Sequence, residues 1–536
     1  MASPDPTSAP VATGGGLAEN DVRIRPLIVI AILLALLMGA LDQFVVLTAL
    51  PSILKEFGQP NSGTTVVTTY IITSTVAIPI FGKLSDLWSR RNVFLGGLVI
   101  FVVGSALAGL SQSLPELIVF RAVQGFGSGG FFPVGIAIVG VTFPPAARAR
   151  ITGLLSGVFG IATVAGPLIG SWIVDATTWR WVFYVNLPVG ILGAVLLMLS
   201  LGPLRPEVKR RFDAVGAGLL VGWVGALEYA LIQVSDSGWA WTDPRVLGLL
   251  AVAAIVGVVF VLWELRDRIE PLVPLRLLKQ RIVAVSGTTT FLVGAVFFPL
   301  ATFISLIVGI ALTPPGSSSA DTVRDVLYAL VLPLVVGAAL GGQLLTRISY
   351  RVQTVAGLAI AIVGMAFLRE LTVATPVWTL EFGFLPVGGV VLPLIPLGFG
   401  VGLTFPVFLL AVQNEVAPKD LGEASGLVQF LQSLGGSIGL SVLASYATSR
   451  FDQLDPLPNP VCNTPAGASQ SVCLPYLQGL AAADVSAYDA AFTVMLGILV
   501  AALVVALFYR GQFLRHAVEI PAPETPIEAV APVARE

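Results

Sequence analysis

The chain has 536 residues, of which 56% are hydrophobic and only 11% are charged, and its mean hydropathy is +0.91. Soluble domains carry about 25% charged residues, so this composition excludes a soluble globular protein. The formal net charge of -2 says little by itself, and we expect no nucleic-acid partner.

Apolar runs recur along the whole chain, and each is long enough to cross a hydrocarbon core about 30 Å thick. They predict an all-α polytopic membrane protein with fourteen membrane-spanning helices. Most Lys and Arg residues fall in the loops on one side of these spans, so we expect both termini to face the cytoplasm of a plasma (inner) membrane. The predicted spans are 27–50, 64–84, 93–111, 115–140, 152–174, 182–202, 213–234, 245–265, 282–310, 326–346, 352–368, 386–412, 422–446 and 490–510.

Basic stretches at 205–211 and 266–281 divide these spans into groups of six, two and six. Segments 82–86 and 342–346 occupy equivalent places in the two groups of six, which indicates two pseudo-symmetric bundles with a substrate site between them near the bilayer midplane. The predicted parts are a disordered cytoplasmic N-terminus (1–26), a six-helix bundle (27–204), a two-helix linker (205–281), a second bundle (282–510) with a long outer loop (449–489), and a disordered cytoplasmic tail (511–536).

Ionisable residues inside the spans are the strongest functional signal. Asp42 lies in the first apolar run, where a carboxylate costs roughly 2.5–3.5 kcal/mol, and Arg121 is the only base that lies in the interior of a span and not at its end. Asp42 is either a site that binds a proton or a cationic substrate, or one half of a fixed ion pair with Arg121. Gln124, one turn along from Arg121, is a candidate member of this network. Glu228 is either a second proton or substrate contact, or an acid that reaches water near the outer end of its span.

Four further segments have distinctive compositions. Residues 82–91 form a short charged loop, and residues 121–130 place Arg121 before a run of glycines that permits close helix packing. Glycines recur through 157–170. Residues 179–188 contain the aromatic side chains that favour a membrane interface.

With Asp42 and the residues that follow it to Pro51, these segments resemble the major facilitator superfamily, specifically its fourteen-helix drug:H+ antiporter branch. Residues 82–91 look like motif A of that family, 121–130 like motif B, and 157–170 like the antiporter motif C. The chain departs from the family pattern at single positions within or near these segments, which are Phe44, Leu87, Ser89, Ser171 and Thr346.

The resemblance implies roles for these segments. Asp42 and Arg121 would couple transport to protons. Four residues of the motif A loop would form a gating latch, in which the acid contacts a helix N-terminus of the other bundle near Gly422; they are Gly82, Asp86, Arg90 and Arg91. Five residues of the third segment would allow close sliding contact between the fifth and eighth core helices; they are Gly157, Gly160, Gly166, Pro167 and Gly170.

Two other residue sets are candidates from the sequence. Cys462 and Cys473 share one outer loop, which favours a local disulfide, and no metal site is expected. Aromatic residues in the spans are either cavity-lining or simple packing residues, and the candidates are Phe44, Tyr70, Phe131, Phe132, Trp223 and Phe405.

These observations predict a proton-coupled efflux antiporter for amphiphilic or cationic drug-like compounds, working as a monomer by alternating access. It would use the proton gradient and no cofactor, and would not be an enzyme. If Asp42 alone exchanges one proton for one monovalent cation, transport is electroneutral. The alternatives are an exporter of lipids or another native amphiphile, whose outer loops would dock an outer partner protein, and a membrane sensor or enzyme without transport.

Overall fold

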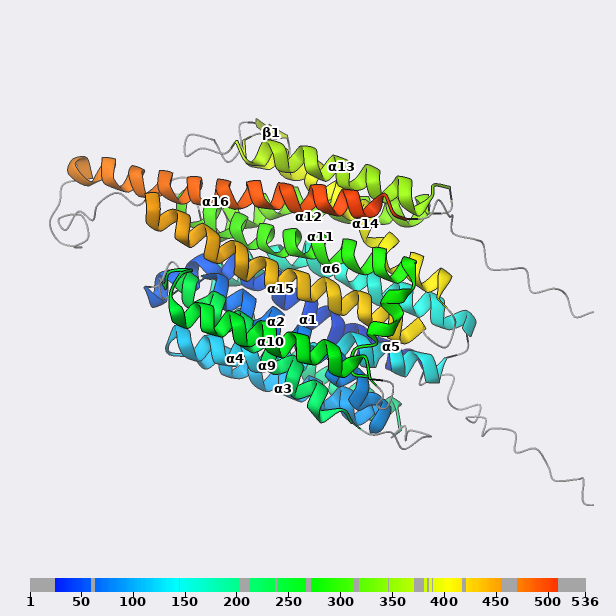
Figure 1. Ribbon diagram of the computed structural model, residues 1–536. Helices are drawn as coiled ribbons and strands as arrows, with labels where there is room; N and C mark the ends of the chain where they lie inside the picture. Colours follow the sequence, from blue (N-terminus) through cyan, green and yellow to red (C-terminus); the bar gives the residue numbers. More distant parts are fainter. Residues whose placement is uncertain are drawn as a thin grey trace, which may run out of the picture.

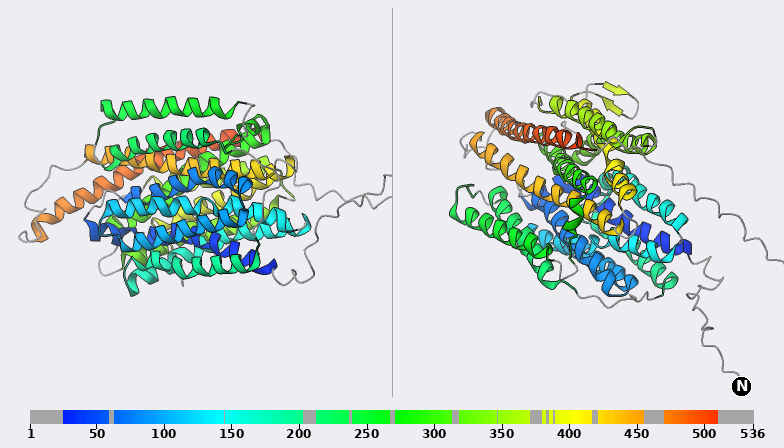
Figure 2. Two further views of the ribbon diagram at one scale, coloured as in Figure 1. Left: turned by 90° about the horizontal axis from the view of Figure 1, so that it is seen from below. Right: turned by 45° about the vertical axis from the view of Figure 1, so that its right-hand side comes forward.

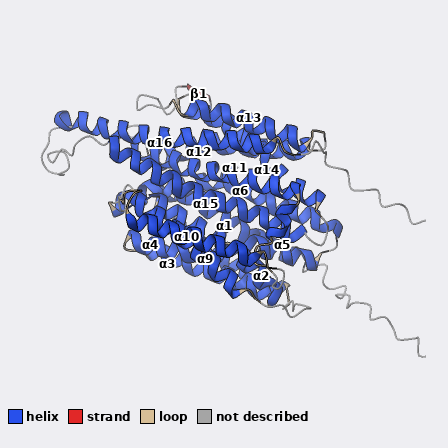
Figure 3. Ribbon diagram, in the orientation of Figure 1, coloured by secondary structure: helices blue, strands red, loops and turns tan. Residues whose placement is uncertain are grey.

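The computed structural model of the chain is almost entirely helical (Figures 1 and 3). Its membrane-spanning helices run side by side along one direction, and within the described residues the only strands are β1 (Leu380–Phe382) and β2 (Leu385–Val387), which pair antiparallel. The predicted all-α membrane fold is therefore confirmed. The structure describes residues 25–58, 63–143, 145–202, 212–236, 239–266, 271–312, 318–345, 347–370, 380–382, 385–387, 389–416, 421–454 and 470–509.

The first bundle contains eight helices because two of its predicted spans are broken. One break falls at Gly129 and Gly130; the other precedes Pro188, which has no N–H to donate to the carbonyl four residues earlier. The helices are α1 (Arg25–Phe57), α2 (Gly63–Leu87), α3 (Arg90–Leu110), α4 (Leu114–Ser128), α5 (Phe131–Thr142), α6 (Pro145–Ala176), α7 (Trp181–Tyr184) and α8 (Asn186–Ser200).

Two linker helices and a second bundle follow. The linker helices are α9 (Ala214–Asp236) and α10 (Pro244–Glu264), and a short 3-10 helix, η3 (Leu275–Lys279), leads into the second bundle. That bundle contains α11 (Arg281–Leu306), which continues as the π-helix η4 (Ile307–Leu312), and α12 (Ser319–Leu344), α13 (Tyr350–Leu368), α14 (Val391–Glu415), α15 (Leu421–Leu454) and α16 (Gln470–Ala506).

Thirteen helices among the described residues are long and apolar enough to cross a membrane, and the remaining predicted span corresponds to α6, whose apolar part is Gly160–Ala176. Two predicted boundaries were wrong. The span expected from 386 begins only at Val391, because β2 and the left-handed Gly389 (φ 49°) precede it. The outer loop expected at 449–489 is largely helical, since α15 continues to Leu454 and α16 begins at Gln470.

The two bundles meet along two seams and around α1. α2 packs against α15, α6 packs against α12, and α1 contacts both α11 and α12. At the end predicted to face outward, η4 lies directly on α1, because a Cβ added to Gly309 would be only 2.3 Å from Cγ of Pro51. The bundles are therefore in tight contact at their outer ends.

The linker helices lie at one edge of the molecule (Figure 2). α10 packs against α9, while α9 also contacts α15 of the second bundle and α2 of the first. The first linker helix therefore covers the seam between α2 and α15.

Candidate functional site

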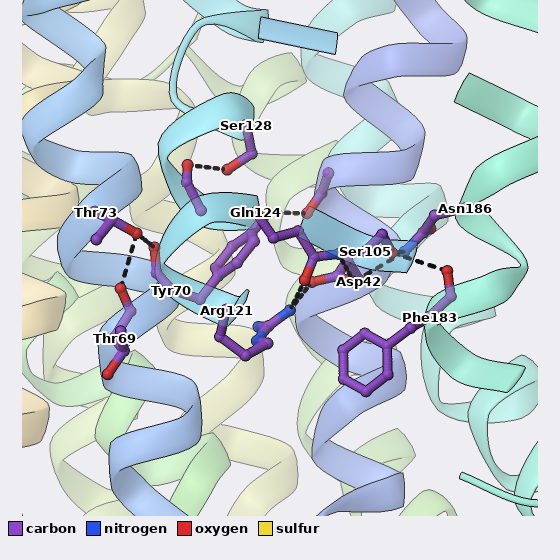
Figure 4. A network of polar contacts seen from close by, with 12 residues as sticks. Asp42, Thr69, Tyr70, Thr73, Ser105, Arg121, Gln124, Ser128, Phe183 and Asn186 are labelled. Carbon is purple, nitrogen blue, oxygen red and sulfur yellow. Dashed lines mark hydrogen bonds and ion pairs between the residues drawn. The ribbon is translucent and has the colours of Figure 1, made fainter. Parts of the chain in front are cut away.

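The carboxylate of Asp42 is buried in the first bundle and has a complete set of hydrogen-bond donors (Figure 4). Its Oδ2 forms an ion pair with Nη1 of Arg121, and its Oδ1 accepts from Nε2 of Gln124 (2.8 Å) and from Nδ2 of Asn186 (3.0 Å). Asp42 is only 1% exposed. All three donors are side chains of the first bundle, so the carboxylate is fully hydrogen-bonded within that bundle.

Arg121 is held mainly through one end of its guanidinium group. Nη1 donates to Asp42 and, at 2.7 Å, to Oε1 of Gln124, whereas Nε has no hydrogen-bond partner among the described residues. The guanidinium carbon lies 4.2 Å from the centre of the Tyr70 ring, a cation–π contact. The Tyr70 hydroxyl donates to the carbonyl of Gly39 (3.1 Å), which fixes this ring.

Two members of the network, Ser105 and Asn186, were not predicted from the sequence. Nε2 of Gln124 and Nδ2 of Asn186 each lie 3.0 Å from Oγ of Ser105, whose O–H donates to the carbonyl of Phe183 (2.8 Å). Asn186 belongs to the aromatic segment that we assigned to the membrane interface. The only sequence feature that could have indicated its role was a polar amide inside an apolar span. In the structure, Asn186 is the first residue of α8.

Glycines bring the helices of this network together. A Cβ on Gly104 of α3 would be 2.6 Å from the backbone nitrogen of Gln124, and one on Gly125 of α4 would be 2.3 Å from Oγ1 of Thr73 on α2. α4 therefore lies in direct backbone contact with both neighbours. This close packing places Arg121 and Gln124 in reach of α1.

Helix α6 contacts the eighth core helix, as expected, but the two most tightly packed glycines of its segment face α1 instead. A Cβ on Gly166 would be 2.5 Å from Cβ of Phe44, and one on Gly170 would be 2.1 Å from Oγ1 of Thr48. The eighth core helix is α12, and a Cβ on Gly160 would lie at an ordinary contact distance, 3.9 Å, from the side chain of Val335 on that helix. Gly157 and Pro167 also lie within α6. For Gly166 and Gly170 the expected partner helix was therefore wrong, since both glycines contact α1, the helix that carries Asp42.

A small cavity lies between the bundles and includes Arg121 in its wall. The lining residues come from α1, α2, α4 and α11, and they are Gln43, Phe44, Leu47, Val67, Tyr70, Ile71, Arg121, Phe297, Phe298, Ala301 and Thr302. Its free space is about 20 Å³, which is room for a single water molecule. A drug-sized ligand needs about 300–1,000 Å³. The cavity is therefore nearly closed in this conformation.

Of the six aromatic candidates, Phe44 and Tyr70 line this cavity. Phe405 contacts the lining residue Phe297, with ring centres 5.8 Å apart. The other three belong to packing. Phe131 lies among Phe94 and Phe101 in the first bundle, Phe132 packs against the hydrophobic core, and Trp223 stacks on Phe260 in the linker pair (5.8 Å).

The expected latch is described only in part. Gly82 lies within α2, while Arg90 and Arg91 begin α3. Nη1 of Arg91 donates to the carbonyl of Leu201 (2.8 Å) at the end of α8, so this contact stays within the first bundle. The side chain of Asp86 lies outside the described residues, and its contact with the second bundle stays a prediction.

Glu228 and the cysteines were the remaining candidates. Glu228 is only 2% exposed and accepts a hydrogen bond from Ser441 of α15, so it does not reach water as one of the two interpretations required. It is not among the residues that line the cavity described above. Cys462 and the side chain of Cys473 lie outside the described residues, and the disulfide stays a prediction.

Comparison with known proteins places the chain in a large group of transporters. Residues 32–440 match the family model described as Major Facilitator Superfamily. The chain is 32% identical to the multidrug transporter protein MdtP of Bacillus subtilis (81% of this chain, 78% of the relative). It is also 32% identical to multidrug resistance protein 3 of the same organism (79% and 80%). A crystal structure of a POT family transporter in complex with 5-aminolevulinic acid shares the fold, with a TM-score of 0.60, 14% identity and coverage of 90% and 96%.

Proposed function

Because the chain belongs to the Major Facilitator Superfamily and is thus a multi-pass membrane transporter rather than an enzyme, we propose that it exports amphiphilic or cationic drug-like molecules in exchange for protons. The names of its bacterial relatives support multidrug efflux. Asp42 is the proposed proton-coupling residue.

One observation carries the proposal: Arg121 belongs both to the wall of the interbundle cavity and to the ion pair with Asp42. A change in the charge of Asp42 therefore alters the electrostatic environment of the cavity through the side chain of Arg121. Ionised Asp42 holds Arg121 and neutralises its charge. Protonated Asp42 loses this attraction, and the guanidinium group then keeps only its hydrogen bond to Gln124 and its contact with the Tyr70 ring, so that it can turn toward the cavity.

This linkage makes proton and substrate binding mutually exclusive without a shared binding atom. A guanidinium group in the cavity repels a cation and occupies the volume that a neutral amphiphile needs. Conversely, a substrate in the cavity favours the pairing of Arg121 with Asp42, and so the loss of the proton. Exchange across the membrane follows if the bundles alternate between inward and outward openings.

Proton release from the purified protein in weakly buffered detergent tests the proposal. The panel contains tetraphenylphosphonium as a cation, chloramphenicol as a neutral compound and a diacylglycerol as a lipid. At least one member of the panel should release protons from the wild-type protein, and Asp42→Asn should lower that release at least tenfold. Release by the lipid alone would favour the native-amphiphile alternative.

The matched control is Glu423→Gln. Glu423 is a half-exposed acid that pairs with Arg276 (2.9 Å) near the start of α15, outside the network and the cavity. This variant should release as many protons as the wild type. Proton-coupled transport at the full wild-type rate by Asp42→Asn in vesicles would disprove the role of Asp42.

A further inference from the structure

Glu228 is a buried carboxyl group with only half of its hydrogen-bonding capacity satisfied. Ser441 of α15 donates to Oε2, while Oε1 has no hydrogen-bond partner among the described residues. The residue is 2% exposed and lies within α9, a helix that spans the membrane. In contrast, every oxygen of the Asp42 carboxylate has a donor.

No cation compensates Glu228 in the described part of the chain, where neither Lys nor Arg forms an ion pair with it. An unpaired charge at such a site is costly, and a carboxyl group avoids the cost by retaining its proton. The charged residues of α9 and of the three helices packed against it lie toward the helix ends: Lys83 and Asp86 on α2, Asp236 on α9, Arg245 and Glu264 on α10, and Glu423, Arg450 and Asp452 on α15.

Glu228 lies on a helix that contacts both bundles, so its surroundings depend on how the two bundles are packed against each other. Serines at four-residue spacing on one face of α15 bind the linker: Ser441 binds Glu228, Ser445 donates to the carbonyl of Leu231 (2.8 Å), and Ser449 accepts from Nε1 of Trp241 (3.2 Å). α9 is thereby fixed to the second bundle. It also contacts α2 of the first bundle, so a movement of α2 away from α15 changes the surroundings of Glu228.

We propose that Glu228 is a second proton-binding site, which holds its proton while the seam between α2 and α15 is closed and releases it when the seam opens to water. This inference rests on the proposed proton-coupled transport for its role in the cycle. With Asp42, it brings the number of protons carried to two. Exchange of two protons for one monovalent cation moves net charge, so transport would respond to the membrane potential and would not be electroneutral.

Proteoliposomes containing wild type, Glu228→Gln or Asp42→Asn test the charge balance with tetraphenylphosphonium as the probe. A potassium diffusion potential without a pH gradient should drive transport by the wild type. Glu228→Gln should respond at least tenfold less to this potential while still responding to a pH gradient. Equal responses of wild type and Glu228→Gln to the potential would overturn the second site. Loss of all proton dependence in the wild type would instead refute the proposed function.

Infrared difference spectroscopy of the protein in nanodiscs decides the protonation of Glu228 without any transport. Wild type and Asp42→Asn should show the carbonyl stretch of a buried protonated carboxyl group at neutral pH, shifted in D2O, and Glu228→Gln should lack it. Ser441→Ala should move this band, because the hydrogen bond is lost. Identical spectra of wild type and Glu228→Gln would overturn the proposal. Since Gln is a neutral near-isostere of the protonated acid, Glu228→Gln should unfold at the wild-type temperature.

Discussion

At the scale of single residues, the charge of Asp42 depends on side chains from two other parts of the first bundle. Arg121 and Gln124 come from α4 and Asn186 begins α8, so the carboxylate is satisfied only while these helices keep their places around α1. A buried carboxylate that loses a donor pays for desolvation without full compensation. The proton binding that we propose for Asp42 would therefore depend on the packing of the bundle, as the proposed coupling role requires.

Asn186→Ala should destabilise the protein through Asp42. The substitution removes the 3.0 Å hydrogen bond to Oδ1, and hydrogen bonds to charged groups contribute about 1.5–3 kcal/mol. Thermal unfolding in detergent should show a loss of this size in the wild-type background and a clearly smaller loss in the Asp42→Asn background, because the two residues interact directly. Additive losses in the double mutant would show that Asn186 does not stabilise the protein through Asp42. Thr75→Val is the control, since the buried hydroxyl of Thr75 donates to the backbone carbonyl of Ile71 (2.7 Å) and does not belong to this network.

At the scale of helices, the apolar runs predicted where the membrane is crossed but not how each helix is rotated. Span lengths follow from composition, so the count of spans and the two charged partners Asp42 and Arg121 were accessible from the sequence. The sequence did not predict other site residues, among them Asn186, Phe297 and Phe298. The helices that carry them are apolar on nearly every face, so the sequence pattern does not show which side of each helix contacts which neighbour. The same uncertainty produced the wrong partner for Gly166 and Gly170.

Gly170→Val should disturb the contact between α6 and α1. A Cβ at this position would lie 2.1 Å from Oγ1 of Thr48 and 2.8 Å from the carbonyl oxygen of Val45, both close to Asp42 along α1. Overpacking typically costs about 1–3 kcal/mol and moves the backbone. The free energy of unfolding, measured by thermal denaturation, should fall by about 1–3 kcal/mol. Proton release should also fall, because α1 carries Asp42 and is displaced.

Gly160→Val is the matched control in the same helix. Its added Cβ would lie 3.9 Å from the side chain of Val335, an ordinary contact, so this variant should retain more stability and more proton release than Gly170→Val. The reverse order would show that the contact between α6 and α12 is the more demanding one.

At the scale of the whole molecule, polar contacts hold the two bundles together at the end that we expect to face outward. Ser318, just before α12, donates to Oδ1 of Asp175 on α6 (2.6 Å), and Nη1 of Arg324 on α12 lies 3.3 Å from Oγ of Ser171 on α6. Together with the contact of Gly309 with Pro51, these residues join the two bundles at that end. In the proposed export cycle, release to the outside would require these contacts to separate.

A reversible cross-link between Asp175→Cys and Ser318→Cys should therefore stop transport, in a background where Cys462 and Cys473 are replaced by Ser. A short methanethiosulfonate cross-linker should abolish efflux in vesicles, and a reductant should restore it. The control pair is Glu56→Cys with Arg180→Cys, which replaces an outer ion pair of 2.7 Å within the first bundle. Cross-linking this pair joins two parts of one rigid unit and should spare transport. Full efflux by the cross-linked Asp175→Cys and Ser318→Cys pair would mean that the exit route does not pass between α6 and α12.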